Sequence, residues 1–493
     1  MNILNNKINI YIILFFIILV ALGIRLYKIS DPFYYLFDSI SAQFGQPARN
    51  YLRFDFKETL PVNLFNGGKI QDQPLMKYLS YTPFPSLLIS FFGIFLEINE
   101  TLIRIISLLI YFFAAFLFYK VLKLIYNIET IFFTIIIFLF FSITIHYSRV
   151  YFHENLSSPF MLLIFYFYYL WITTENKKYF KYIVIFHFLG LLFNFDLLFI
   201  PFTLIILQIC FKRKNTLKLF FWNILTNVFF SLIFLCNHIY HSNGFDAFLK
   251  KLFYRSIVSK DITFFIFLKG LIDHYFFHYS YFIGILIIIT GIIFIFKNYF
   301  DKNKLLFPLY IILNYTMYIF FFKQAAYTAF CVTYPFSFAY AVFIGYFLYL
   351  MVQKNYKKST IFFCILFILF SVYYYKNNYL KKHYYTPVSF GKAINKVTDI
   401  NDIILTNYDF SSENYYFNFA ADRWVIFNIK SKEDIENILT KYKDKYNIVF
   451  VTNKADSIYN EIFSNTQFKE EYIYRFYLLN QKSNNRYKFK QVD

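Results

Sequence analysis

The sequence predicts an all-α polytopic membrane protein with a small extracytoplasmic α/β domain at its C-terminal end. Of the 493 residues, 58% are hydrophobic and 16% are charged, and a soluble domain of this size could not bury so much apolar surface. Apolar blocks recur through the first part of the chain, whereas the residues from His383 onward are mixed polar. We therefore expect a membrane domain at 1–376 and a soluble domain at 377–493.

Eleven apolar blocks approach the roughly 20 residues that a helix needs to cross a bilayer. They lie at 8–24, 101–122, 130–147, 157–172, 180–194, 197–211, 218–239, 281–296, 305–322, 326–350 and 359–375. Two of the blocks are short, so we expect 11 to 13 spans. The first block, with Lys7 before it, could be a signal peptide, but the many blocks that follow favour an uncleaved span.

Lys and Arg, which give the chain a net charge of +20, gather in alternate gaps between the blocks. These basic clusters lie at 120–123, 177–181, 212–218, 297–304 and 354–358. The positive-inside rule places them in the cytoplasm together with the N-terminus, provided that the Pro-interrupted block Phe84–Leu96 does not span. The non-cytoplasmic regions are then 28–100, 147–156, 240–280 and the residues after 377. This alternation favours a plasma-membrane or inner-membrane protein and gives no indication of nucleic acid.

The C-terminal region has the pattern of a strand–helix–strand domain. Residues 402–406, 424–427 and 447–452 read as strands because they are short apolar runs bounded by polar residues. Ser431 and Asp434 form a capping box, which predicts that a helix begins there.

The predicted spans contain no Asp, Glu, Lys or Arg between their ends, which argues against a transport pathway. His187 is the one titratable candidate inside a span, and a lone histidine on an apolar helix is more often structural. Polar residues gather instead at the non-cytoplasmic ends of the spans. They are Asp38, Gln46, Arg49, Asn50 and Arg53 in the first outer region, and Arg149, His153 and Glu154 in the second.

These residue types suit a reaction at one membrane face, because a carboxylate can act as a general base and Arg can bind phosphate. Structural roles remain open for each of them. Asp38 could cap an interfacial helix, Glu154 could pair with Arg149, and Arg255 could bind lipid headgroups. The aromatic residues between Tyr275 and Tyr281 could stack on sugars or form an interfacial belt.

The first 200 residues resemble the membrane glycosyltransferases of the GT-C superfamily, especially the protein mannosyltransferase and aminoarabinose transferase branch, which is similar to glycosyltransferase family 39. The resemblance rests on an acidic residue soon after the first span, an Ala-Arg-Asn helix, a proline element, an acidic-to-arginine spacing and a second outer loop with Arg and Glu. The corresponding residues are Asp38, Ala48-Arg49-Asn50, Tyr81-Thr82-Pro83-Phe84-Pro85, Glu100 with Arg104, and Arg149 with Glu154. Ser39 stands where many relatives have Glu, and no basic residue precedes the prolines.

The resemblance implies an inverting transferase that moves a sugar from a polyprenyl-phosphate donor to a hydroxyl acceptor at the non-cytoplasmic face. Asp38 would be the base with Glu154 beside it, and Gln46, Asn50 and His153 would position the substrates. The donor phosphate would bind Arg49, Arg149 and Arg255. A divalent metal is left open. The alternative is a flippase, transporter or non-catalytic envelope component that handles lipid-linked sugars.

Overall fold

The structure is a computed structural model, and it divides into two compact units that we describe separately. It describes residues 7–33, 35, 37–54, 63–65, 67–68, 77–78, 82–211, 216–241, 263–323, 326, 330–380, 385–408, 414–427, 429, 431–453, 468–471 and 474–480. The first unit comprises Met1–Ile29 and Arg104–Leu380, and the second comprises Ser30–Ile103 and Lys381–Asp493. Most of the predicted first outer region thus belongs to the same unit as the C-terminal residues.

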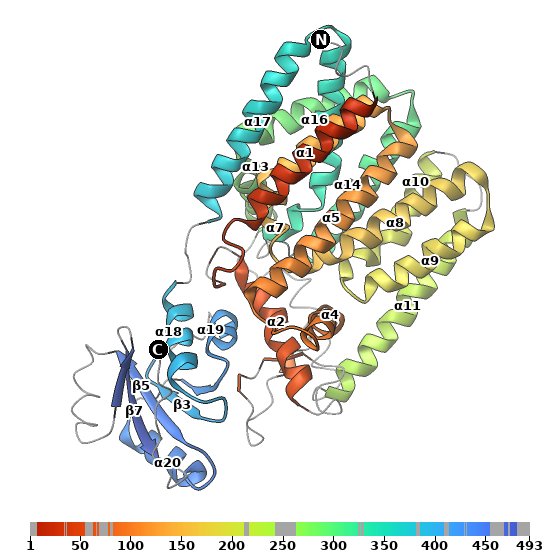
Figure 1. Ribbon diagram of the computed structural model, residues 1–493. Helices are drawn as coiled ribbons and strands as arrows, with labels where there is room; N and C mark the ends of the chain where they lie inside the picture. The colour runs from red at the N-terminus through yellow and green to blue at the C-terminus, as the bar shows by residue number, and fades with distance from the viewer. Residues whose placement is uncertain are drawn as a thin grey trace. The chain divides into compact units, whose positions relative to one another are not determined.

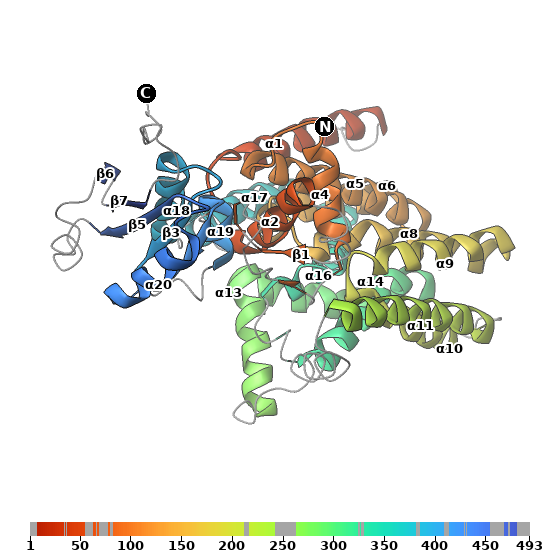
Figure 2. The ribbon, with the colours of Figure 1, turned by 90° about the horizontal axis from the view of Figure 1, so that it is seen from below.

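The first unit is made of apolar helices that pack along one another (Figures 1 and 2). Its elements are α1 (Lys7–Leu26), α5 (Glu100–Ile125, which begins in the second unit), α6 (Ile128–Phe140), α7 (Ser142–Tyr147), α8 (His153–Thr174), α9 (Lys177–Leu191), the 3₁₀ helix η2 (Phe195–Phe199), α10 (Ile200–Cys210), α11 (Thr216–His241), α13 (Phe264–Asn298), α14 (Lys302–Phe321), the 3₁₀ helix η3 (Phe330–Thr333), α16 (Phe336–Gln353) and α17 (Lys357–Asn378). Seven described helices are long and apolar enough to cross a membrane, which confirms the polytopic helical class. Each predicted block contains a helix.

Three helix boundaries differ from the sequence prediction. The block 130–147 is broken at Phe141, where φ is −56° and ψ is 135°, so it forms two helices. Among the described residues of the block 326–350, the long helix begins at Phe336 and the 3₁₀ helix Phe330–Thr333 precedes it. The prediction of a loop at 240–280 is wrong for the residues after Thr263, because α13 already begins at Phe264. Residues 242–262 lie outside the described part of the chain.

Helix α13 is kinked at Ser280, whose φ of 63° is unusual for a residue other than glycine. The aromatic residues Tyr275 and Tyr279 therefore lie on a helix rather than in a loop. Tyr279 is buried, and its ring packs edge-on against Phe141 and Tyr340. Packing of this kind explains the aromatic cluster without a ligand.

The second unit combines two helices of the first outer region with a C-terminal α/β domain. Helix α2 (Asp38–Arg53) packs against α4 (Phe84–Gly93), and a short hairpin pairs β1 (Asn63–Leu64) with β2 (Lys77–Tyr78). The 10 residues of α4 span about 15 Å, half of what a bilayer core requires, which agrees with the prediction that this block does not cross.

The C-terminal domain has a five-stranded sheet in the order β4-β3-β5-β7-β6, in which β4, β3 and β5 are parallel and β7 and β6 are antiparallel additions. Its elements are α18 (Tyr385–Val397), β3 (Ile403–Thr406), α19 (Asn414–Ala421), β4 (Trp424–Ile426), α20 (Lys432–Tyr442), β5 (Ile448–Asn453), β6 (Phe468–Glu471) and β7 (Tyr474–Asn480). The three predicted strands and the capping box at Ser431 are confirmed.

Alternation along the strands builds two cores in this domain. Ile404 and Val449 point to the face covered by α18 and α19, whereas Ile403 and Ile448 pack with α20 on the other face. Figure 1 shows α18 and α20 on opposite sides of β3 and β5. Because both faces are covered, the central strands read as continuous apolar runs in the sequence.

Candidate functional site

The proposed base, Asp38, occupies the first turn of α2 and is buried, with 3% of its surface exposed. Its Oδ2 accepts a hydrogen bond from the backbone N–H of Tyr35 at 3.1 Å, and Phe37 before it has a left-handed φ of 65°. A carboxylate at this position is favourable because the first turn of a helix carries partial positive charge. Asp38 does not cap α2 in the way the sequence left open, because Phe37 is the N-cap residue and no side chain in the described part of the chain makes a capping hydrogen bond there. The role of Asp38 as a base stays a prediction.

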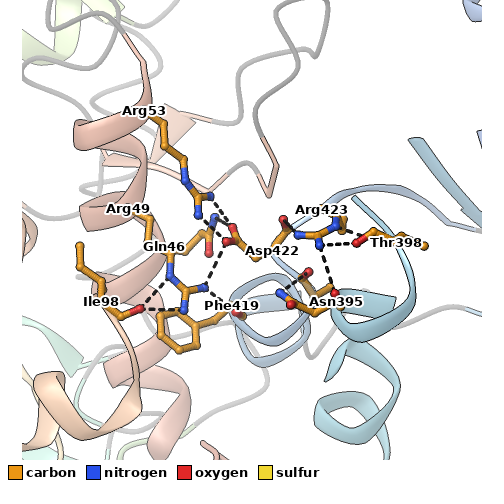
Figure 3. A network of polar contacts seen from close by, with 10 residues as sticks. Gln46, Arg49, Arg53, Ile98, Asn395, Thr398, Phe419, Asp422 and Arg423 are labelled. Atoms are coloured by element: carbon orange, nitrogen blue, oxygen red, sulfur yellow. Dashed lines mark hydrogen bonds and ion pairs between the residues drawn. The ribbon is translucent and has the colours of Figure 1, made fainter. Parts of the chain in front are cut away.

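Further along α2, the residues predicted to share a face divide between two partners. Gln46 Nε2 donates to Asp422 Oδ1 at 3.3 Å, and Arg53 makes a bidentate contact with the same carboxylate. Asn50 instead donates to the backbone carbonyl of Leu64 at 2.6 Å. The spacing of Gln46 and Arg53 thus brings both to one carboxylate of the C-terminal domain (Figure 3).

Asp422 is a buried carboxylate that the sequence did not single out. Burial alone would raise its pKa, but the hydrogen bond from Arg53 and the charges of Arg49 and Arg53 outweigh burial and lower the pKa to about 2. It therefore remains ionised under all ordinary conditions. Its φ of 49° is left-handed, and the neighbouring Arg423 contacts Thr398 and Asn395 on and just after α18.

Arg49, a predicted phosphate ligand, is heavily engaged within the second unit. Its Nε and Nη2 donate to the carbonyl of Ile98 at 3.1 and 2.8 Å, and its Nη1 donates to the carbonyl of Phe419 at 2.7 Å. The guanidinium carbon lies 3.9 Å from the centre of the Phe419 ring, and Nη1 lies 3.7 Å from Asp422. Burial lowers the pKa of Arg49, and Asp422 opposes that shift. Phosphate binding by Arg49 stays a prediction.

In the first unit, Arg149 follows α7 and is 4% exposed. Its Nη1 donates to Tyr375 Oη at 2.5 Å and its Nη2 to the carbonyl of Lys28 at 2.8 Å. Within the described part of the chain its buried Nε has no hydrogen-bond partner, and Glu154 is not among its contacts. A buried guanidinium with a donor to spare can accept an anionic ligand.

Imidazole and phenol rings cluster around Tyr375, the phenol that Arg149 contacts. The His146 ring stacks on Tyr379 at 4.3 Å, and His278 Nδ1 lies 2.6 Å from Tyr379 Oη. Tyr375 lies in the last turn of α17 and Tyr379 is its C-cap residue, so the end of α17 places two phenols beside residues from α7 and α13. Neither histidine was selected from the sequence, where His146 falls at the end of the block 130–147 and His278 in the predicted loop 240–280.

The other predicted residues of this region, His153 and Glu154, open α8 and are both buried. One turn later, Ser157 Oγ donates to Asp196 Oδ2 at 3.0 Å, and Tyr315 Oη donates to the same oxygen at 2.7 Å. Asp196 is fully buried, and its Oδ1 has no hydrogen-bond partner among the described residues. The sequence signal for Asp196 was present, since it is an acidic residue in a gap between two apolar blocks.

Asp196 belongs to η2, whose backbone is held by side chains from several helices. Asn314, His187 and Asn227 contact the carbonyls of Asp196, Leu197 and Leu198 at 3.2, 3.0 and 2.8 Å. These contacts satisfy carbonyls that a 3₁₀ segment leaves unpaired. They favour the structural interpretation of His187.

The acidic residue and the arginine of the α5 motif, Glu100 and Arg104, belong to different units. Glu100 pairs with Lys392 at 3.3 Å in the second unit, and Arg104 Nη1 donates to the carbonyl of Ile29 at 2.9 Å in the first. Arg255 lies outside the described residues. Among the described residues, no three His, Cys, Asp or Glu side chains come together as a metal-binding group.

The architecture is thus that of a polytopic helical membrane protein joined to an α/β domain. No protein-family model matches the chain, and no curated protein matches it in sequence. Solved structures do match its fold. The structure of ArnT from Cupriavidus metallidurans bound to undecaprenyl phosphate has a TM-score of 0.63 and 9% identity, and the match covers 94% of this chain and 97% of that one.

An archaeal oligosaccharyltransferase is also similar. The Archaeoglobus fulgidus enzyme tethered with an acceptor peptide containing the NVT sequon has a TM-score of 0.57 and 9% identity, with 91% of this chain and 69% of that chain covered. A structure of the same enzyme complexed with Zn and sulfate has a TM-score of 0.56 and 12% identity, with 89% and 68% covered. These matches show that the chain shares the fold of ArnT and of this oligosaccharyltransferase.

Proposed function

We propose that this protein is an integral membrane glycosyltransferase that transfers a sugar from a polyprenyl-phosphate donor to a hydroxyl acceptor. The observation that carries the proposal is the fold match along 94% of the chain to a structure bound to undecaprenyl phosphate. The buried Arg149, with a donor to spare beside Tyr375, supports an anionic ligand in the first unit. The sequence motifs around Asp38, Arg49 and Glu154 support the same class of enzyme.

In the proposed reaction Asp38 takes the proton of the acceptor hydroxyl while the hydroxyl oxygen attacks the anomeric carbon of the donor sugar. The bond from that carbon to the phosphate oxygen breaks, its electron pair leaves with the lipid phosphate, and the configuration inverts. Arg149, with Arg255, would stabilise the charge that develops on the departing phosphate. No step of this scheme is carried by a metal.

Supporting roles follow from the remaining residues. Glu154 would orient the acceptor with help from His153, and Gln46 and Asn50 would position the substrates through α2. The contacts of Arg49 with Ile98, Phe419 and Asp422 favour a role in holding α2 over direct phosphate binding. We place the reaction on the non-cytoplasmic face of the plasma or inner membrane, with the basic clusters in the cytoplasm.

Binding of lipid phosphate tests the part assigned to Arg149. The purified full chain should bind undecaprenyl phosphate more tightly than undecaprenol, because only the former carries charge for the guanidinium. In Arg149→Gln this preference should fall by about tenfold or more, since a charge-assisted contact is lost. Native mass spectrometry of the protein in detergent with either lipid measures the ratio.

Arg104→Gln is the matched control, because Arg104 is also a buried arginine that donates to a backbone carbonyl. It should keep the preference for the phosphate. An unchanged preference in Arg149→Gln would remove this residue from the donor site.

The base assignment separates the enzyme from the flippase, transporter or envelope-component alternative. Asp38→Asn removes the proton acceptor while keeping the size of the side chain, so surface glycan transfer should be lost while membrane insertion is normal. Mass analysis of surface glycans from cells with the wild-type or variant protein reports the outcome. Transfer at the wild-type level would exclude Asp38 as the base.

A further inference from the structure

Helix α2 and the C-terminal domain meet at an interface that is both apolar and ionic. Gly45 on α2 lies so close to α19 that an added Cβ would come within 2.6 Å of the Phe419 ring. Arg49, which lies one turn further along α2, stacks its guanidinium on the Phe419 ring, with the guanidinium carbon 3.9 Å from the ring centre. The ring of Phe33 packs on the same ring, with 5.0 Å between the two centres. Phe419 is therefore seated between residues of the segment that carries Asp38.

The ionic part of the interface lies next to Phe419. Asp422 receives the bidentate contact from Arg53, with Arg49 nearby, and Gln46 donates to the same carboxylate. Residues 46, 49 and 53 are spaced so that successive turns of α2 present their side chains to one point. Figure 3 shows these three side chains converging on Asp422 from α2.

The other side of Asp422 is anchored in the C-terminal domain. Arg423 donates to the carbonyls of Thr398 and Asn395 at 2.6 and 3.1 Å, and thereby fixes the turn to the end of α18. Asp422 keeps a left-handed φ of 49° in this turn, a conformation that a non-glycine residue holds only where its surroundings impose it. Two adjacent side chains of this turn therefore contact two helices: Arg423 binds the end of α18, and Asp422 binds α2.

We infer that Asp422 is a positioning residue, through which the C-terminal domain locks helix α2 in place. The lock is built from Asp422, Arg49 and Arg53, with Phe419 seated against Gly45. Its consequence for catalysis rests on the proposed function, because α2 carries Asp38 at its first turn. A carboxylate that must meet a hydroxyl proton tolerates little displacement, so a loosened α2 would slow transfer.

Hydrogen exchange of the full chain in detergent tests the lock without reference to activity. Asp422→Asn keeps the size of the side chain but leaves two partly buried guanidinium groups, those of Arg49 and Arg53, without their anion. Amide exchange across Asp38–Arg53 should then rise by about tenfold or more. Arg53→Gln removes the bidentate contact from the other side and leaves the C-terminal domain's own residues intact, so it should raise exchange in the same helix.

Asp434→Ala is the matched control in the C-terminal domain. Asp434 completes the capping box of α20, on the face of the sheet opposite α18 and α19. Its loss should raise exchange in α20 and leave α2 protected. Wild-type exchange of α2 in both Asp422→Asn and Arg53→Gln would overturn the lock, as would an equal rise in the Asp434→Ala protein.

Glycan transfer gives the second measurement. Surface glycans from cells that make Asp422→Asn should be depleted, whereas those from Asp434→Ala cells should match the wild type. If α2 loosens while transfer is unchanged, the positioning role is overturned although the lock stands. Failure of Asp38→Asn to affect transfer is a separate result, which removes the proposed base and leaves the exchange data unaffected.

Discussion

At the scale of single residues, the buried ionised groups of this protein are held by side chains from distant parts of the chain. Arg25 is fully buried, and its Nε donates to Ser148, its Nη1 to the carbonyl of Ala21, and its Nη2 to Tyr111 and the carbonyl of Leu139. Asp422 joins Gln46 across 376 residues of sequence. Hydropathy and spacing report on neighbours within a few turns, so neither partnership could be predicted from the sequence.

The loss of unfolding free energy on removing a tyrosine hydroxyl should depend on the group that accepts its hydrogen bond. Tyr315 donates to the carboxylate of Asp196, whereas Tyr310 on the same helix donates to the carbonyl of Met161. At a pH where Asp196 is ionised, Tyr315→Phe should lower the free energy of unfolding by about 2 kcal/mol and Tyr310→Phe by about 1 kcal/mol, because bonds to charged groups are stronger. Unfolding in detergent, followed for both variants, measures the difference. Equal losses would mean that Asp196 is not ionised.

The pH dependence of Asp422 follows from its lowered pKa. A carboxyl with a folded pKa of about 2, against an ordinary 3.8, contributes stability that is complete above pH 3.8 and is lost as pH falls through 2. This corresponds to about 2 kcal/mol. The protection factor of α2, which is the intrinsic amide exchange rate divided by the measured rate, should therefore fall in the wild type between pH 5 and 2. The Asp422-dependent part of that fall should be missing from Asp422→Asn.

At the scale of elements, the break between α6 and α7 is a feature that the sequence did not predict. The whole block 130–147 is apolar and reads as one span, because nothing in it is a helix breaker. In the structure Phe141 leaves the helical region, and the carbonyl of Phe138 accepts from Thr144 Oγ1 at 2.6 Å, while that of Leu139 accepts from Arg25 at 2.7 Å. The freed carbonyls are thus satisfied by side chains, one of them from another helix.

This arrangement predicts that Arg25 stabilises the break. Arg25→Met removes all four contacts and leaves the carbonyl of Leu139 unsatisfied in an apolar bundle, so it should cost about 3 kcal/mol. Of the four Arg25 contacts, Ser148→Ala removes only that to Nε, together with the bond from Ser148 Oγ to the carbonyl of Ile145, and it should cost about 1 kcal/mol. Thermal unfolding of the two variants in detergent gives the comparison. Similar midpoints for both would show that the break does not depend on the arginine.

Elements with local signals were predicted well. The capping box fixes the start of α20 at Ser431, and the apolar runs of β3 and β5 are strands because both faces of the sheet are covered. The kink at Ser280 had no such signal, since a left-handed serine in the middle of an apolar helix is imposed by packing. The prediction of a loop before Tyr281 failed because α13 already begins at Phe264.

At the scale of the whole molecule, membrane orientation is the prediction on which the proposed reaction depends. The basic clusters and the C-terminal domain should lie on opposite sides of the bilayer. Lys178 is the second residue of α9 and belongs to one such cluster, and Ser389 lies on α18 of the C-terminal domain. A cysteine at each position can be tested in a background from which Cys210, Cys236, Cys331 and Cys364 have been replaced.

A membrane-impermeant maleimide should label Ser389→Cys in intact cells and should reach Lys178→Cys only after the membrane is permeabilised. This outcome would put the α/β domain, and with it α2 and Asp38 of the same unit, on the side where lipid-linked donors would be used. Labelling of Lys178→Cys in intact cells would mean that the orientation is the reverse of the predicted one. The five basic clusters lie in alternate gaps between the spans, so all five would then be on the non-cytoplasmic side. The reaction would then have to occur on the cytoplasmic face, where the proposed donor geometry does not apply.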